Sequence, residues 1–386
     1  MKGIDDYTTQ ACRVDAADLE RFCGQVFVEM GLGETAAAQS AAVLVAADLR
    51  GIHSHGVARL QRYVNGLRDG QMLPDASPAL VHKKGAAFVI DAGGGMGAPA
   101  GIMAMRCVIE RAKKMGSAFA CVKNSNHFGI AGYYAMMALP ENMLGLAMTN
   151  TAALGVPTFG RQVMFGTNPL AFAAPADKEG AFVLDMSTTV VSRGKLEVYD
   201  KQRKKLPEGW ATDKTGRCAS DAHGVLEDMF HRHGGGILPL GGVGKMFGGH
   251  KGYGLAVMVD ILCSVLGGAP FGAAISDTAT SSASVSHFFG AISIEGFREA
   301  KEFRRDMDRM LTELRSCPVA AGEERVYYAG QQERELETWR RGYGIPLIPQ
   351  TMESLNAIAR DLHVPAPRLK TRANTQRAAE PTADGV

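Results

Sequence analysis

The middle of the chain constrains the fold most, because short apolar segments alternate there with helical patterns. The first of these segments, residues 86–91, ends in the glycine loop 93–97 and leads into a helix expected at about 100–115. A strand, a loop and a helix in this order predict an α/β unit. Further strand-like runs stand at 119–123, 144–149, 170–174 and 182–186, with helices expected at about 130–138 and 253–266. We therefore predict one α/β domain with a mixed sheet over residues 79–315.

Helical patterns flank this region on both sides. Asp15 is a suitable N-cap for a helix over 16–30, and a second helix is expected over 35–49. A third, at about 54–69, places four apolar side chains on one stripe: Val57, Leu60, Val64 and Leu67. Charged helical segments return at 297–316, 333–343 and 352–362, and we expect them to fold back on the N-terminal helices.

The chain thus divides into three parts. A helical domain comprises residues 1–78 and 316–364, and the α/β domain comprises residues 79–315. Residues 365–386, rich in Pro, Ala, Thr and Arg without apolar periodicity, predict a disordered tail. A serine-rich stretch at 281–286 predicts a surface loop.

Charge and cysteine content exclude several classes of protein. The chain has 386 residues, with 42 Lys and Arg against 40 Asp and Glu, a net charge of +2. The basic residues are spread along the chain, which argues against nucleic-acid binding. The longest stretches without charge are broken by Gly, Pro or Asp before they reach the roughly 18 residues of a membrane span. Seven cysteines without a C-x-x-C pair, and an N-terminus without an apolar segment, predict reduced thiols in a cytoplasmic protein.

Glycine is unusually abundant, with 46 of 386 residues, against a typical share of about 7%. The loop at 95–100 fits G-x-G-x-x-A between a strand and a helix, the position of the Rossmann dinucleotide fingerprint. The second strand, however, ends in Lys123-Asn124-Ser125 and not in the acidic residue that such a site needs. A tight structural turn is therefore the better interpretation of this loop.

A second glycine cluster, 234–254, places Lys251 before an apolar helix. Backbone amides, the helix dipole and the lysine charge would together favour an anion at this point. A solvated loop lysine is an equally good interpretation of the sequence.

A histidine, a serine and an arginine stand close together in the segment 50–59, which reads Arg-Gly-Ile-His-Ser-His-Gly-Val-Ala-Arg. Ser54 is a natural N-cap, which would place His55 in the first helical turn and Arg59 four residues later over the same face. The helix dipole would favour the neutral, base-competent imidazole. A guanidinium can hold a carboxylate through two hydrogen bonds. Taken alone, such a pattern is more often the start of an ordinary surface helix.

A second polar constellation, Asn-Ser-Asn-His-Phe-Gly at 124–129, follows a predicted strand. The carboxyl ends of strands are where α/β sheets bind ligands, so His127 is a candidate site residue, with a core or capping histidine as the alternative. We predict no metal site, because the His-x-His pairs at 53–55 and 231–233 lack Cys or carboxylate ligands at regular spacing.

Six motifs in this order resemble the malate/L-lactate dehydrogenase family, which is distinct from the Rossmann-type enzymes. The family includes sulfolactate, ureidoglycolate and diketogulonate oxidoreductases and a cyclic-imine reductase. The resemblance extends from about Leu19 to about Pro346. The motifs are Arg-Gly-Ile-His-Ser-His-Gly at 50–56 with Arg59 and Tyr63, Asn-Ser-Asn-His-Phe-Gly at 124–129, Thr-Asn-Thr at 149–151, Gly-Thr-Asn-Pro at 166–169, Asp-Met-Ser-Thr at 185–188 and Gly-His-Lys-Gly-Tyr-Gly at 249–254.

The resemblance implies a mixed-sheet, non-Rossmann cofactor domain, terminal helices on the substrate side and an active site built at a homodimer interface. It implies that Ser54 and His55 form a proton-relay pair, that Arg59 holds the substrate carboxylate and that His127 lies beside the nicotinamide as a second acid–base candidate. The residues implied to line NAD or NADP are Thr151, Asp185, Met186, Ser187, His250 and Lys251.

The activity expected from this resemblance is hydride transfer between NAD(P) and a small 2-hydroxy acid such as malate or lactate. Reduction of a cyclic imine, or of a keto acid such as diketogulonate or sulfopyruvate, is the alternative, and a non-catalytic nucleotide-binding protein is a third. Two departures from the family pattern stand out. Residues 329–333 read Ala-Gly-Gln-Gln-Glu where the family usually has P-G-E-x-E, and the stretch 212–248 is longer and richer in His and Gly than expected.

Overall fold

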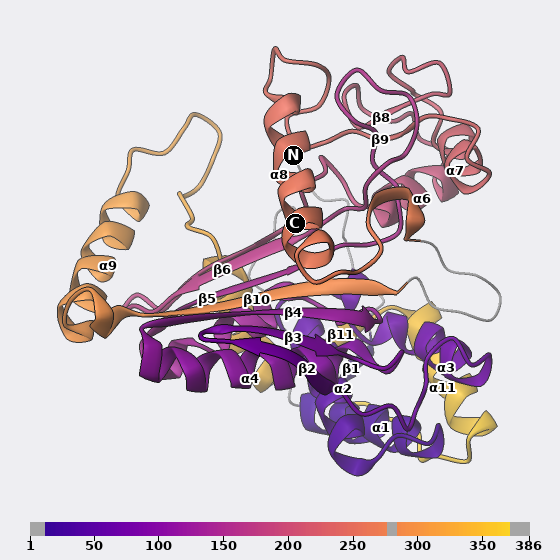
Figure 1. The fold of residues 1–386 in the computed structure, drawn as a ribbon. Coiled ribbons are helices and arrows are strands. Elements are labelled where there is room, and N and C mark those ends of the chain that lie inside the picture. The colour runs from indigo at the N-terminus through magenta and orange to yellow at the C-terminus, as the bar shows by residue number, and fades with distance from the viewer. Residues whose placement is uncertain (1–11, 276–283, 371–386) are drawn as a thin grey trace.

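A seven-stranded mixed sheet organises the fold (Figure 1). The computed structural model describes residues 12–275 and 284–370. The strand order is β2-β3-β4-β10-β5-β6-β7, in which β3 and β4 are parallel and the other neighbours antiparallel. The predicted mixed, non-Rossmann sheet is therefore confirmed. The strands are β2 (Ala79–Lys84), β3 (Ala87–Asp91), β4 (Ser117–Ser125), β5 (Met143–Thr149), β6 (Leu170–Ala174), β7 (Phe182–Met186) and β10 (Val285–Ser293).

Strand β10 lies at the centre of the sheet, although the sequence did not predict it. It pairs with β4 along one edge and with β5 along the other. The expectation of a surface loop over 281–286 is wrong for Val285 and Ser286, which are buried in this strand. Residues 281–283 lie outside the described residues.

Helices cover both faces of the sheet (Figure 1). Helices α4 (Gly97–Met115) and α5 (Ala131–Met136) pack on one face and enclose the main hydrophobic core with it. Helix α8 (Gly249–Asp260) continues as a π-helical turn (Ile261–Val265), and this pair covers the other face over β4, β5 and β10.

The first and last segments of the chain build a second core together. Helices α1 (Ala16–Glu29), α2 (Glu34–Leu49) and α3 (Leu60–Arg68) pack with the C-terminal helix α11 (Pro349–Asp361). A short antiparallel pair, β1 (Cys12–Val14) and β11 (Ile345–Leu347), joins the two ends. Helices α10 (Gln331–Tyr343) and α11 thus fold back on the N-terminal helices, as expected. The same expectation is wrong for the segment 297–316, because its helix packs against the turn between β6 and β7. The domain boundaries at 78/79 and 315/316 stay predictions.

The beginning of the predicted tail is ordered. The Lys370 amide donates to the carbonyl of Arg13 at 2.8 Å, and its ammonium lies 3.3 Å from the carboxylate of Asp15. A predicted disordered tail is therefore wrong for residues 365–370, because these contacts hold them against α1. Residues 371–386 lie outside the described residues.

A third, smaller core forms around the stretch 212–248. It contains α6 (Arg193–Lys201), α7 (Ala222–Phe230) and the short strand pair β8 (Ala211–Thr212) and β9 (Gly236–Ile237). The stretch that is longer than expected in the sequence therefore builds a packed unit beside α8 (Figure 1).

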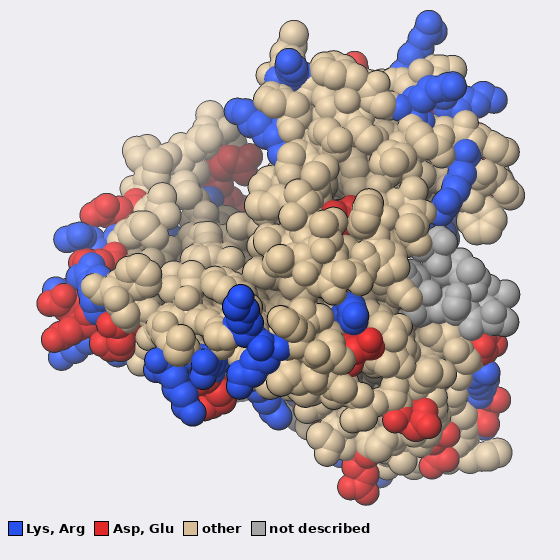
Figure 2. Space-filling view, viewed as in Figure 1, with Lys and Arg blue, Asp and Glu red and all other residues tan. Residues whose placement is uncertain are grey.

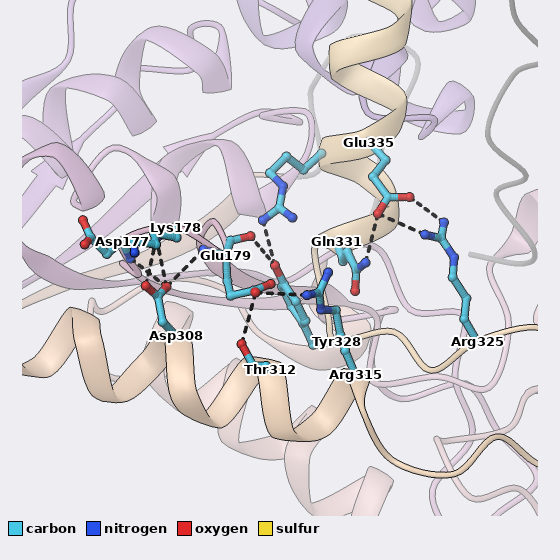
Figure 3. A network of polar contacts seen from close by, with 11 residues as sticks. Asp177, Lys178, Glu179, Asp308, Thr312, Arg315, Arg325, Tyr328, Gln331 and Glu335 are labelled. Carbon is cyan, nitrogen blue, oxygen red and sulfur yellow. Dashed lines mark hydrogen bonds and ion pairs between the residues drawn. The ribbon is translucent and has the colours of Figure 1, made fainter.

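The turn between β6 and β7 anchors α9 (Ala300–Arg315) and the start of α10 (Gln331–Tyr343), as Figure 3 shows. Asp308 of α9 accepts hydrogen bonds from three consecutive amides of this turn, those of residues 177, 178 and 179, at 2.9–3.1 Å. The Glu179 carboxylate accepts from Thr312 at 3.1 Å and from Arg315 at 3.0 Å. Tyr328, just before α10, donates to the Glu179 carbonyl at 2.6 Å. These bonds fix where α10 begins, and α10 contacts the site described next.

Over residues 12–275 and 284–370, no helix combines the length and apolar character that crossing a membrane requires.

Candidate active site

The segment 53–59 folds into two successive 3₁₀ turns, His53–His55 and Val57–Arg59, and α3 begins only at Leu60. The prediction of one helix from about residue 54, with Ser54 as its N-cap, is therefore wrong. Gly56, between the two turns, has an extended backbone (φ −87°, ψ −154°), which interrupts the helical path.

The turns nevertheless bring the three predicted residues together. The Ser54 hydroxyl lies 2.9 Å from Nδ1 of His55, and Nε of Arg59 donates to the Ser54 carbonyl at 2.7 Å. Burial, and then the charge of Arg59, lower the pKa of His55 to about 4. The imidazole is neutral at pH 7, as expected, but burial and a neighbouring cation are the cause and not a helix dipole.

His127 lies directly across from His55. The two rings stack with their centroids 5.4 Å apart and their planes at 26°. Nδ1 of His127 contacts the Tyr63 hydroxyl at 2.5 Å and the Gly129 amide at 3.4 Å. A backbone amide can only donate, so Nδ1 is the acceptor and the ring proton is on Nε2. Burial, and then the charge of His55, lower the pKa of His127 well below its usual value.

The Nε2 atoms of both rings are the open positions of this pair. Within the described parts of the chain, neither has a hydrogen-bond partner. Two neutral imidazoles and a guanidinium therefore converge on one place. Such a group can bind a carboxylate and exchange a proton with a neighbouring oxygen.

A third histidine, which the sequence did not predict as a site residue, contacts the residues that flank the Asn126–His127 pair. His287 is fully buried in β10, where Thr149 lies 2.7 Å from its Nδ1 and Ser125 lies 2.8 Å from its Nε2. Its ring stacks on Phe128, with centroids 4.4 Å apart. His287 thereby fixes the two residues on either side of the Asn126–His127 pair. The sequence signal that could have indicated His287 is a histidine followed by two phenylalanines, but it lies in a strand that the sequence did not predict.

The glycine loop 93–97 has a structural role. Gly93 and Gly94 adopt positive φ angles of 62° and 77°. At Gly97, the first residue of α4, a Cβ atom would overlap the carbonyl oxygens of Asn126 and His127. The helix start therefore packs directly on the backbone that carries His127. This packing supports the tight-turn interpretation of the loop.

The motifs assigned to cofactor binding meet in one hydrogen-bonded region. The Thr167 amide donates to the Thr151 hydroxyl at 3.1 Å, and the Thr188 amide donates to the Thr167 carbonyl at 2.9 Å. The Leu240 amide continues the series by donating to the Thr188 carbonyl at 2.9 Å. Gly252 of α8 packs so closely on Leu240 that a Cβ atom would overlap its carbonyl oxygen.

The remaining predicted cofactor residues lie at the ends of β7 and α8. Met186 ends β7 and Ser187 follows it, with the Ser187 hydroxyl donating to a carbonyl at 3.0 Å. His250 and Lys251 are exposed in the first turn of α8. Asp185 accepts the Gly132 amide of α5 at 2.7 Å, and burial raises the pKa of Asp185 to about 6. A close backbone approach, with a cation and amides at a helix start, fits the phosphates of a dinucleotide.

The segment that departs from the family pattern lies beside these residues. Gly330 has a positive φ of 87° and packs on Val183 of β7. Gln331 is buried, and its amide donates to Glu335 at 2.9 Å. The change from glutamate to glutamine therefore leaves the segment against the strand that carries Asp185.

No group of three or more His, Cys, Asp or Glu side chains suited to hold a metal occurs in the parts of the chain that the structure describes.

The chain is similar in sequence and in structure to known proteins. Residues 14–356 match the family model described as malate/L-lactate dehydrogenase. A malate dehydrogenase of Pyrococcus abyssi is 40% identical over 91% of this chain and 95% of its own length. An L-sulfolactate dehydrogenase of Methanocaldococcus jannaschii is 36% identical over 83% of this chain and 89% of its own. The crystal structure of malate dehydrogenase from Entamoeba histolytica superposes with a TM-score of 0.89 at 33% identity, covering 93% of this chain and all of that one.

Proposed function

Because the chain belongs to the malate/L-lactate dehydrogenase family, we propose that it transfers a hydride between NAD or NADP and a small 2-hydroxy or 2-oxo acid. Malate and lactate are the preferred candidates, since the similar chains include a malate dehydrogenase. The observation that carries the proposal is the stacked pair of neutral imidazoles, His55 and His127, beside the Arg59 guanidinium.

Each side chain of the site has a role in this chemistry. Arg59 would hold the substrate carboxylate, because a guanidinium binds a carboxylate through two parallel hydrogen bonds. The Nε2–H of His127, fixed by Tyr63 and Gly129, would donate to the 2-oxo oxygen. His55, oriented by Ser54, is the second candidate for the same proton. Proton transfer by a positioned group typically contributes about 10²–10⁴-fold to the rate.

The cofactor would lie on the region built by α8 and by the hydrogen-bonded residues Thr151, Thr167 and Thr188. The nicotinamide, when bound, supplies or accepts the hydride. The residues proposed to hold the dinucleotide are Thr151, Asp185, Met186, Ser187, His250 and Lys251.

The test is a panel of 2-oxo acids, with pyrroline-2-carboxylate included, assayed with NADH and with NADPH by nicotinamide absorbance. Turnover of oxaloacetate or pyruvate supports the proposal, and preferred turnover of the cyclic imine favours the alternative substrate class. No turnover of any 2-oxo acid with either cofactor would refute the proposed function.

Variants of the site then assign the roles. His55→Ala and His127→Ala are expected to differ in kcat, and the variant with the larger loss identifies the proton carrier. Arg59→Ala is expected mainly to raise KM for the acid, because the carboxylate loses its partner. Cofactor affinity should stay unchanged in all three variants.

We also propose that the protein forms a homodimer and is cytoplasmic. Five apolar side chains are exposed on one side of α8 and its π-helical turn: Val257, Met258, Ile261, Val265 and Leu266. The part of the surface over α8 is mostly uncharged (Figure 2). All seven cysteines are free thiols, which supports a reducing compartment. Light scattering on the purified chain measures the oligomeric state, and a monomer would contradict the first proposal.

A further inference from the structure

One buried carboxylate fixes both ends of the turn that carries Ser54 and His55. Asp48, near the end of α2, is 1% exposed. Its Oδ1 lies 2.9 Å from Nδ1 of His53, and its Oδ2 accepts the Val57 amide at 2.7 Å. These two partners stand immediately before and after residues 54–56. A 3₁₀ turn has poor internal hydrogen-bond geometry, so its shape depends on such external bonds.

The residue between the two turns is fitted to the same carboxylate. A Cβ atom at Gly56 would overlap the carboxyl group of Asp48. Since Gly56 is extended and does not need a positive φ, contact with the carboxylate is what requires glycine at this position.

The opposite side of His53 contacts the C-terminal part of the chain. Its Nε2 lies 3.1 Å from Nη1 of Arg340, a residue of α10 that is 5% exposed. Nη1 of Arg340 also donates to the backbone carbonyl of Asp48. A guanidinium can only donate and a carboxylate can only accept. Both contacts of His53 are therefore hydrogen bonds only when its ring is neutral with the proton on Nδ1.

We propose that Asp48 is a positioning residue for the reaction, acting through His53 and the Val57 amide, and that Arg340 makes the turn geometry depend on α10. The bonded series runs from α10 to His53, to Asp48 and then to the turn that places His55 against His127 and Arg59 beside Ser54. The kinetic part of this inference rests on the proposed function, while the hydrogen-bonded arrangement can be tested without substrate.

The kinetic experiment uses Asp48→Asn, which keeps the shape of the side chain and removes its charge and one acceptor. A displacement of reacting groups by about 1 Å can cost about 10²-fold. We expect kcat to fall about 10- to 100-fold, with a rise in KM for the acid because Arg59 moves with the turn. The concentration of active sites is measured by cofactor binding. With rates expressed per active site, a loss of folded protein alone would change neither kcat nor KM.

The matched control is Glu337→Gln. Glu337 of α10 pairs with Arg50 at 3.2 Å, so it joins the same two parts of the chain without touching residues 53–57. Its kinetic constants should stay close to those of the parent. Equal constants in Asp48→Asn and Glu337→Gln would overturn the proposal.

A pair of variants at His53 guards against misfolding of the Asp48 variant. His53→Asn retains an N–H donor near the position of Nδ1, whereas His53→Phe keeps only a ring. Activity should largely survive in the first and fall in the second, with similar melting temperatures. Equal losses in the two variants would also contradict a role for the bond to Asp48.

The substrate-free measurement is NMR of ring ¹⁵N nuclei. We expect the parent to show His53 in the Nδ1–H form, and the His55 and His127 signals to move in Asp48→Asn but not in Glu337→Gln. An Nε2–H form of His53 would refute the arrangement. If no 2-oxo acid is turned over, the proposed function fails, and these spectra still decide whether Asp48 positions the turn.

Discussion

Acidification is expected to destabilise the protein through His287, which is buried as a neutral imidazole at the centre of the sheet. Burial lowers the pKa of His287 from 6.5 to about 3. In the unfolded chain this side chain has the ordinary pKa and binds a proton below about pH 6.5. In the folded protein it does so only near pH 3. The contribution of the neutral ring is fully present above pH 6.5 and is lost as the pH falls toward 3.

The size of the effect at a given pH follows from how far that pH lies below the pKa of the unfolded chain, as long as it stays above the pKa of the folded protein. At pH 4.5, the unfolded chain is about two units below its titration point, while the folded protein is still above its own. With about 1.36 kcal/mol per unit, the loss in the free energy of unfolding is about 2.7 kcal/mol. A typical domain has only about 5–15 kcal/mol in total, so urea denaturation can measure this loss.

The comparison uses His287→Asn, which does not titrate and can still bond one of the two hydroxyls. We expect this variant to be less stable than the parent at pH 7.5, by about 2 kcal/mol, because it loses one hydrogen bond and the stacked ring. Between pH 7.5 and pH 4.5, however, the parent should lose about 2.7 kcal/mol more than the variant.

The control is His82→Asn, which replaces an exposed histidine on β2. It should lose as much stability on acidification as the parent does. If the parent and His287→Asn lose the same amount between the two pH values, His287 is not held neutral by burial and the reasoning fails.

Three further predictions concern the site and its support. Tyr63→Phe removes the hydroxyl that contacts Nδ1 of His127 and should lower kcat about tenfold with cofactor affinity unchanged. Steady-state kinetics and cofactor titration measure the two quantities, and an unchanged kcat would contradict the role of the hydroxyl. Gly97→Ala should destabilise the fold by about 1–3 kcal/mol, because the added methyl meets backbone, whereas Gly254→Ala, with open space around it, should not lower the melting temperature. Asp308→Asn weakens the bonds to three amides and should cost about 1–2 kcal/mol, with faster proteolysis in α9; a cleavage rate equal to that of the parent would count against this anchoring role.

The parts of the fold that the sequence predicted are those in which each segment carries its own pattern. Helix α1 begins after Asp15, whose side chain accepts an amide at 3.0 Å as an N-cap should. Strand β10 was missed because most of it is buried on both faces, so it lacks the alternation that marks a half-buried strand. The helix predicted from residue 54 failed for another reason. The carboxylate of Asp48, in the preceding helix, accepts the Val57 amide. A contact between two elements leaves no signal in the helical spacing of residues 54–69.

The candidate site shows the same division. Ser54, His55, Arg59 and His127 were recognisable because the short motifs that contain them resemble those of a known family, whereas each motif alone also fits an ordinary surface or core residue. What the sequence could not supply was that His55 stacks on His127. That contact depends on how the 3₁₀ turn His53–His55 packs against the segment that follows β4, and therefore on the whole sheet.

The position of β10 also determines when the molecule can fold during synthesis. Strands β4 and β5 leave the ribosome early, but they are joined only through β10, which emerges more than a hundred residues later. Until then each of them has an unpaired edge, and such edges invite pairing with other chains. We therefore expect nascent chains that end before β10 to need chaperones, and release of the full chain to be followed by rapid closure of the sheet.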